Sequence, residues 1–115
     1  MALKKINRLR KKKEIQDAWS RAKAVSVRSF RLFYVPNGLV HSRFAFVVSK
    51  KVSKSAVLRN RLRRRASEWI RAHPDGVQKG CDYILSFIPL SATISRKDYY
   101  EDIERAFLEC KRRLS

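Results

Sequence analysis

The sequence has few of the residues on which most enzyme chemistries depend. Among 115 residues there are three glycines, two cysteines and two histidines, and 10 acidic residues stand against 28 lysines and arginines. No glycine-rich loop that could cradle a phosphate is visible. Neither a Ser-His-Asp arrangement nor a carboxylate cluster beside the basic residues is visible. We therefore expect no catalytic side chain and no protein-bound metal.

The two cysteines, Cys81 and Cys110, stand alone and lie far in sequence from His41 and His73. This spacing is unlike that of a zinc site. The basic N-terminus lacks the apolar stretch of a secretory signal, so we expect free thiols in a reducing cytoplasm. Since no apolar run approaches the roughly 20 residues of a spanning helix, we expect no membrane partner.

Positive charge is abundant and unevenly distributed. The formal net charge is +18, and residues 1–65 hold 20 basic and 2 acidic residues, whereas residues 66–115 hold 8 of each. A chain with so much self-repulsion is expected to have a polyanionic partner. Nucleic acid is the first candidate, and no protein partner is evident.

The most basic stretch, residues 49–65, carries eight cations and no acid. Apolar residues recur through and beyond it at Leu58, Leu62, Ala66, Trp69 and Ile70. That spacing predicts an amphipathic helix that ends near Ala72, with Ser53 or Ser55 as its N-cap.

The other elements follow from alternation and helical spacing. We predict helices at about 11–22 and 96–113, and strands at 29–35, 41–49 and 82–88. Four acids of the last helix are expected on a solvated face: Glu101, Asp102, Glu104 and Glu109. The sum is a single α+β domain whose basic helix connects two strands.

Aromatic side chains near cations favour RNA over duplex DNA. In the strand at 29–35, Arg31 and Phe33 fall opposite the expected core face, and Trp19 stands beside the basic N-terminal segment. Such rings either pack in a core or stack on unpaired bases. No helix-turn-helix pair or zinc finger is apparent.

At the centre of the chain, residues 43–52 and 56–64 resemble the protein component of bacterial ribonuclease P, most specifically through Arg59-Asn60-Arg61. The resemblance extends over nearly the whole chain. It implies an α-β-β-β-α-β-α order, a four-stranded sheet and a left-handed crossover through the basic helix.

The resemblance also implies a function. The protein would be the accessory subunit of a ribonucleoprotein endoribonuclease in the bacterial cytoplasm, and its partners would be the ribonuclease P RNA and precursor tRNA. The RNA would use Mg²⁺, held by RNA and substrate, to remove the 5′ leader of the tRNA. The rival hypothesis is a structural RNA-binding protein of the ribosomal type.

Site residues are implied by position. Those expected to face the RNA subunit are Lys50, Lys51, Lys54, Arg59, Asn60, Arg61, Arg63, Arg64 and Arg65. The expected leader-binding cleft comprises Ile15, Trp19, Arg31, Phe33 and Arg43. Residues 1–10 are expected to be a basic segment that is flexible without RNA, and the N-terminal cations expected to contribute are Arg8, Arg10, Lys11 and Lys12. The chain departs from the family pattern at Ala45 and Ser53, where glycine is frequent.

Overall fold

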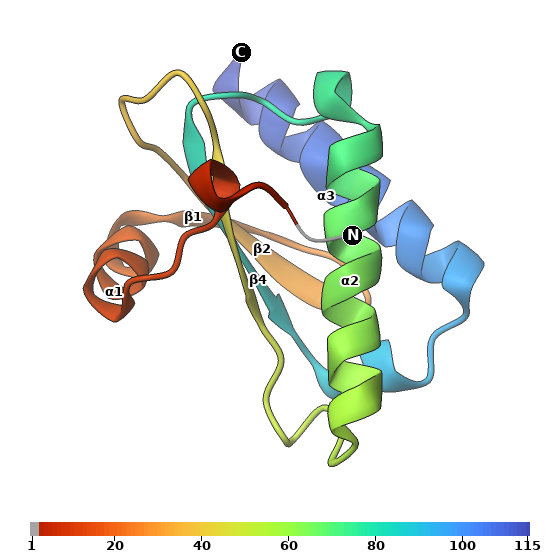
Figure 1. The fold of residues 1–115 in the computed structure, drawn as a ribbon. Coiled ribbons are helices and arrows are strands. Elements are labelled where there is room, and N and C mark those ends of the chain that lie inside the picture. The colour runs from red at the N-terminus through yellow and green to blue at the C-terminus, as the bar shows by residue number, and fades with distance from the viewer. Residues whose placement is uncertain (1–2) are drawn as a thin grey trace.

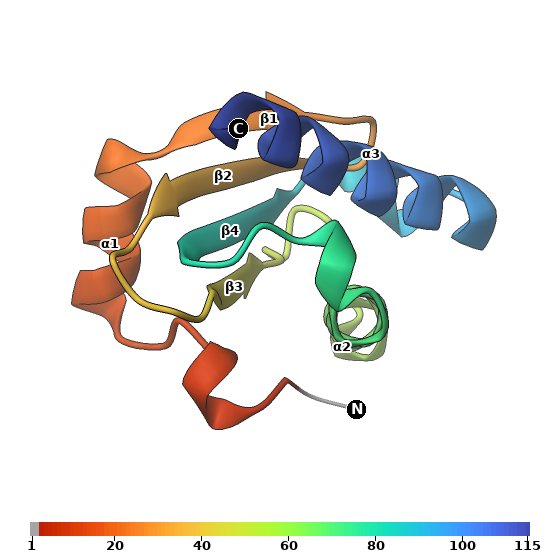
Figure 2. The same ribbon diagram turned by 90° about the horizontal axis from the view of Figure 1, so that it is seen from above.

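A mixed four-stranded sheet separates one helix from two others (Figures 1 and 2). The computed structural model describes residues 3–115. In chain order the helices and strands are α1 (Lys12–Arg21), β1 (Lys23–Ser26), β2 (Phe30–Pro36), β3 (Arg43–Val47), α2 (Ala56–Ala72), β4 (Cys81–Phe87) and α3 (Arg96–Leu114). Short 3-10 turns lie at Lys5–Asn7, Pro74–Gly76 and Pro89–Ala92. The predicted α-β-β-β-α-β-α order is confirmed.

The strand order in the sheet is β1-β2-β4-β3. β2 pairs antiparallel with β1 and β4, whereas β3 pairs parallel with β4. The chain passes from β3 through α2 to β4, and the direction of this crossover is left-handed, against the usual preference (Figures 1 and 2). The helix of this crossover, α2, lies beside the β3 edge of the sheet (Figure 2).

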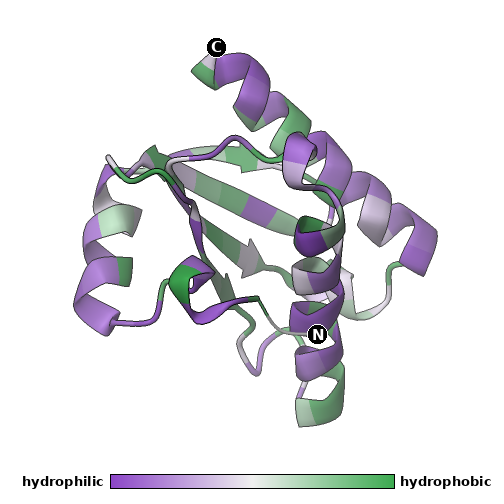
Figure 3. Ribbon diagram, turned by 45° about the horizontal axis from the view of Figure 1, so that its top comes forward, coloured by the Kyte–Doolittle hydropathy of each residue, from purple (hydrophilic) through white to green (hydrophobic). Residues whose placement is uncertain are grey.

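The main core lies between the sheet and the α2–α3 layer. Phe30, Leu32 and Tyr34 of β2 are buried there, as their alternation predicts. The Phe44 ring stacks on Tyr83 with centroids 5.2 Å apart. Figure 3 shows the contrast between apolar strands and largely hydrophilic helices. The predicted stripe of α2 is buried at every position from Leu62 onward, and Leu58 is half-buried.

α2 is held at its start and its middle. Ser55, not Ser53, is the N-cap, and its Oγ accepts a hydrogen bond from the Leu58 N–H at 3.2 Å. The Tyr99 hydroxyl donates to the Leu62 carbonyl oxygen at 2.8 Å, which ties α3 to the centre of α2. Burial raises the pKa of Tyr99, so this donor keeps its proton. The basic helix is thus a fixed element of the fold.

Two sequence predictions require correction at the strands. The strand expected at 41–49 is shorter, because the bonded segment is Arg43–Val47. Residue patterning did not predict β1 at all, although the family resemblance implied a further strand. Only Val25 of its four residues is buried, so β1 lacks a readable alternation.

The solvated face expected for the α3 acids is wrong for Asp102, which is fully buried. Its Oδ1 accepts from Arg28 Nε at 2.9 Å, and its Oδ2 accepts from the Ser29 N–H at 3.0 Å and the Ser29 hydroxyl at 2.7 Å. The hydrogen bond that Arg28 donates to Asp102 also raises the pKa of Arg28. These contacts fasten the β1–β2 connection to α3. By contrast, Glu101 and Glu104 are exposed.

We expect Asp102→Ala to destabilise the fold. The substitution leaves two buried donors of Ser29 without an acceptor, and such orphaned groups cost about 1–3 kcal/mol each, so a loss of about 2–6 kcal/mol is expected. Urea denaturation followed by circular dichroism measures it. Glu104→Ala on the same helix is the control and should stay within about 0.5 kcal/mol of the wild type. Equal effects would mean that the Asp102 contacts do not hold the hairpin.

Candidate nucleic-acid interface

The arginines of α2 lie on the side of the helix away from the core. Arg61 and Arg64 are exposed, whereas Arg59, Arg63 and Arg65 are half-buried. Arg59 Nη1 donates to the Ser53 carbonyl oxygen at 2.8 Å, and Arg63 Nη1 donates to Asn60 Oδ1 at 3.0 Å. These contacts fix two of the guanidinium groups in place. A row of oriented donors of this kind suits phosphate oxygens.

The lysines before α2 lie in a loop whose apolar residues are buried. Val48 and Val52 pack in the core, and the Val52 N–H donates to the Ser49 carbonyl oxygen at 3.0 Å. Between and after them, Lys50, Lys51 and Lys54 are exposed. The loop therefore presents its three predicted cations next to the first turn of α2.

The N-terminal segment adds cations along β3. Leu3 and Leu9 are buried, and the Leu9 N–H donates to the Phe44 carbonyl oxygen at 2.8 Å. Ile6, which lies between them in the sequence, is exposed. Arg10, Lys11 and Lys12 are exposed around the start of α1. Flexibility of residues 1–10 without RNA stays a prediction, and residues 1–2 lie outside the described residues.

A hollow of about 330 Å³ lies between the N-terminal segment, α1, β3 and α2. Its lining includes Arg8 and Arg10 from the N-terminal segment, Ile15 from α1, Val47 from β3 and Arg63 from α2. The structure thus brings together the N-terminal and α2 cations that the sequence separates by about 50 residues.

Beside α1, part of the sheet face stays open. The Trp19 and Phe33 rings contact each other with centroids 5.2 Å apart, and both are half-buried. The next row of the sheet pairs Arg31 with Ser26 and Ser86, and both Arg31 and Ser26 are exposed. The predicted aromatic pair therefore borders a polar strip with an exposed cation, which suits an unpaired strand.

Arg43 is placed differently from the other predicted cleft residues. Its Nε and Nη2 donate to the two carboxylate oxygens of Asp82, each at 2.8 Å, and its Nη1 donates to Glu14 Oε2 at 3.0 Å. The bonds to Asp82, and then to Glu14, raise the pKa of Arg43. Asn37 Nδ2 also donates to Asp82 Oδ1 at 2.9 Å. Arg43 therefore ties α1 to the sheet.

Residue patterning did not predict the partners of Arg43. Asp82 was assigned only to a buried strand, and Glu14 only to a helix. One usable signal was present, because a carboxylate in an otherwise apolar strand requires a cation or several donors once buried.

The described residues offer no evident metal site. Within residues 3–115 no group of three or more His, Cys, Asp or Glu side chains is placed to hold an ion. Cys81 and Cys110 are free and buried, and burial raises the pKa of Cys110 to about 12. In the same range, no helix has the length and apolar character needed to cross a bilayer.

The fold and surface define a small basic α+β domain of the nucleic-acid-binding class, built on a left-handed β3–α2–β4 unit. A family model described as Ribonuclease P matches residues 3–111. The chain therefore belongs to the ribonuclease P protein family, whose members are protein subunits of an endoribonuclease complex.

Individual relatives agree with this assignment. The ribonuclease P protein component of Chromobacterium violaceum is 39% identical over 82 residues, which are 71% of this chain and 67% of the relative. That of Alkaliphilus oremlandii is 31% identical over 113 residues, covering 98% of this chain and 95% of the relative.

Solved structures show the same fold. The RNase P protein of Staphylococcus aureus superposes with a TM-score of 0.84 at 24% identity and covers 91% of this chain and 95% of that one. The RNase P protein from Thermotoga maritima gives a TM-score of 0.76 at 26% identity, with coverage of 94% and 97%. The predicted fold class is thus confirmed.

The geometry predicts a structural role for Arg43. Arg43→Ala leaves the Asp82 carboxylate buried without its cation, and breaking such a pair costs about 3–5 kcal/mol. Glu14→Ala removes only the more exposed contact, for which about 0.5 kcal/mol is expected. Chemical denaturation of both variants tests this contrast. A stable Arg43→Ala protein with weakened RNA binding would instead make Arg43 a binding residue.

Proposed function

We propose that this protein binds the ribonuclease P RNA through α2 and the N-terminal segment, and binds the 5′ leader of precursor tRNA along the open strip beside α1. The observation that carries the proposal is the arrangement around β3. Cations of α2 and of the N-terminal segment gather on one side of this strand, and the Trp19–Phe33 pair with Arg31 lies on the sheet face that α1 partly covers.

Binding to the RNA subunit would rest on phosphate contacts. Arg61 and Arg64 are exposed, and the donors of Arg59 and Arg63 are already oriented by neighbouring groups. Each phosphate that is neutralised releases counterions, so affinity should fall steeply with salt. The three exposed lysines of the loop before α2 extend this surface, and each contributes a compact positive charge.

Binding to the leader would rest on stacking and charge. The exposed parts of Trp19 and Phe33 offer aromatic surface to unpaired bases, and Arg31 attracts the backbone. Stacking of this kind tolerates any base, because every base has a π-face. An accessory subunit that serves many different precursor tRNAs needs that tolerance.

The chemistry itself would belong to the RNA. The catalytic ion we assign to the reaction is Mg²⁺, which prefers a few carboxylates together with phosphate oxygens and water. The acids near the basic surface, Glu14 and Glu68, each lie within salt-bridge distance of an arginine, so they do not form a carboxylate site. The donor set of the described chain does not fit the ion, and we assign Mg²⁺ to the RNA subunit and the substrate.

A structural RNA-binding protein of the ribosomal type would share the charge and the aromatic residues. The match of the Ribonuclease P family over residues 3–111 favours tRNA processing. We accordingly expect the complex to act in the bacterial cytoplasm, with no stable ion on the protein alone.

Reconstitution tests the function directly. We expect purified protein, a bacterial ribonuclease P RNA and precursor tRNA to give the mature 5′ end at low Mg²⁺ and physiological salt, whereas the protein alone cleaves nothing. Gel analysis of end-labelled substrate measures the product. Cleavage by protein alone would refute RNA catalysis, and an RNA that the protein does not stimulate would favour the ribosomal-type alternative.

The leader contact has its own test. Trp19→Ala combined with Phe33→Ala removes both rings of the strip, and a lost base stack costs about 1–3 kcal/mol, which is roughly five- to 150-fold in affinity. We expect that loss for precursor tRNA bound to the reconstituted complex, measured by fluorescence anisotropy. Mature tRNA, which has no leader, is the internal control. Equal losses for both substrates would contradict the assignment of the strip.

A further inference from the structure

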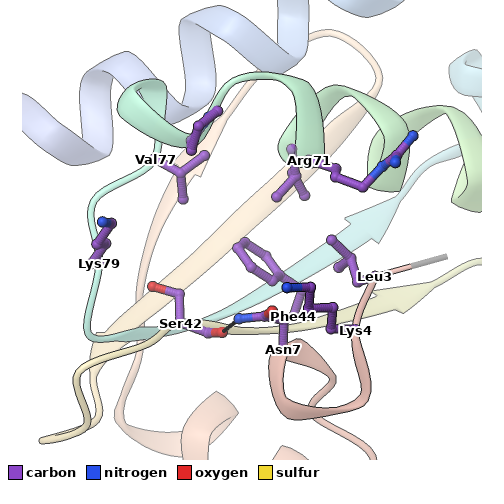
Figure 4. A pocket seen from close by; sticks show the side chains of 10 residues that line it. Leu3, Lys4, Asn7, Ser42, Phe44, Arg71, Val77 and Lys79 are labelled. Carbon is purple, nitrogen blue, oxygen red and sulfur yellow. Dashed lines mark hydrogen bonds between the residues drawn. The ribbon is translucent and has the colours of Figure 1, made fainter. Parts of the chain in front are cut away.

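A second hollow lies on the other side of the N-terminal segment, where no function has been assigned. We call it the N-terminal pocket; Figure 4 shows it from close by. It has a volume of about 320 Å³, at the lower end of the roughly 300–1,000 Å³ typical of small-ligand sites. It is therefore large enough for one small planar group and too small for a helix.

The interior of the pocket is apolar. Leu3, Phe44, Ile70 and Val77 line it, and these come from the N-terminal segment, β3, the end of α2 and the turn before β4. The Phe44 ring lies at the pocket wall (Figure 4). It also stacks on Tyr83 inside the core, which holds it in place. A flat aromatic ligand would find a rigid surface here.

The rim of the pocket is cationic. Lys4, Arg71 and Lys79 line it, all three are exposed, and none of the ten lining residues is acidic. No ion pair within residues 3–115 engages Lys4 or Lys79. An apolar interior with a cationic rim matches a ligand that is planar at one end and anionic at the other.

One polar side chain of the pocket, Asn7, is held in a fixed orientation. Asn7 Nδ2 donates to the Ser42 carbonyl oxygen at 2.8 Å, which fixes the amide (Figure 4). No donor within residues 3–115 is bonded to Asn7 Oδ1, so this oxygen is free to accept from an amino group. Adenine, cytosine and guanine carry such an amino group.

The pocket is also continuous with the candidate RNA surface. Leu3 and Phe44 line both this pocket and the hollow that holds Arg8, Arg10 and Arg63. A strand that follows the N-terminal cations therefore passes the mouth of the pocket. Resting on the proposed RNA partner, we propose that the N-terminal pocket binds one unpaired nucleotide of the ribonuclease P RNA, with its base against Phe44 and its phosphate at Lys4, Arg71 and Lys79.

Methyl NMR of the full chain tests the pocket with adenosine 5′-monophosphate as the probe. A base ring shifts nearby methyl resonances through its ring current, whereas a phosphate does not. We expect the methyl groups of Leu3, Ile70 and Val77 to shift saturably with adenosine monophosphate and to stay in place with ribose 5-phosphate. Val57 and Leu108, which are exposed elsewhere, are the control methyls. Unmoved pocket methyls, or equal shifts at the control methyls, would overturn the pocket.

A matched pair of charge reversals tests the rim. Lys79→Glu should weaken binding of adenosine monophosphate by about fivefold or more, because a cation that donates hydrogen bonds to the phosphate is replaced by a carboxylate that repels it. Lys97→Glu alters the net charge equally, but this exposed lysine lies at the start of α3, outside the pocket. Equal weakening by both variants would contradict a local phosphate contact.

The assembled complex identifies the occupant. With ribonuclease P RNA bound, we expect the pocket methyls to be shifted already and to be insensitive to added adenosine monophosphate. A complex in which the mononucleotide still shifts them would overturn the assignment to RNA. Failure of the pocket would leave reconstituted cleavage intact, whereas a protein that binds no ribonuclease P RNA would refute the proposed function itself.

Discussion

The burial of β4 is the constraint on which the rest of the structure depends. This strand is bonded along both edges, to β2 and to β3, and of its seven side chains only that of Ser86 is not buried. A strand of this kind needs a layer on each face. α1 covers one face beside Ile84, and α2 with α3 cover the other beside Tyr83 and Leu85. The need to bury the apolar side chains of β4 on both faces therefore fixes the positions of the helices that carry the cations.

The second constraint is electrostatic. The net charge is +18, and every acid that neutralises an arginine lowers the positive charge that is available to attract a polyanion. The buried acid Asp82 pairs with Arg43, and the buried acid Asp102 pairs with Arg28. Both pairs hold elements of the fold together. Among the arginines of α2 within the described chain, only Arg64 lies within salt-bridge distance of an acid, with its Nε 3.9 Å from Glu68 Oε1. Charge is thus compensated where the fold needs rigidity and left uncompensated where a partner is expected.

Much of this could be predicted from the sequence, because it depends on local periodicity. The stripe of α2, the alternation of β2 and the position of Phe33 opposite the core all follow from residue spacing. The ion pairs could not be predicted, because they join residues that are 39 and 74 positions apart. Helical spacing accordingly predicts a solvated Asp102, and the family resemblance implies a cleft position for Arg43. Only the tertiary structure shows the partners of both. The N-terminal pocket was missed for the same reason, since its walls come from four separate segments.

The bridge between the N-terminal segment and β3 has a consequence for behaviour at high concentration. β3 is the edge strand of the sheet, and an open edge is a template on which a second chain can add a strand. The N-terminal segment covers part of that edge through the parallel bridge of Arg8 with Phe44 and the hydrogen bond from the Leu9 N–H. Because the segment is cationic, it repels the same segment of a second chain. The segment that we assign to RNA binding thereby also protects the free protein against edge-to-edge aggregation.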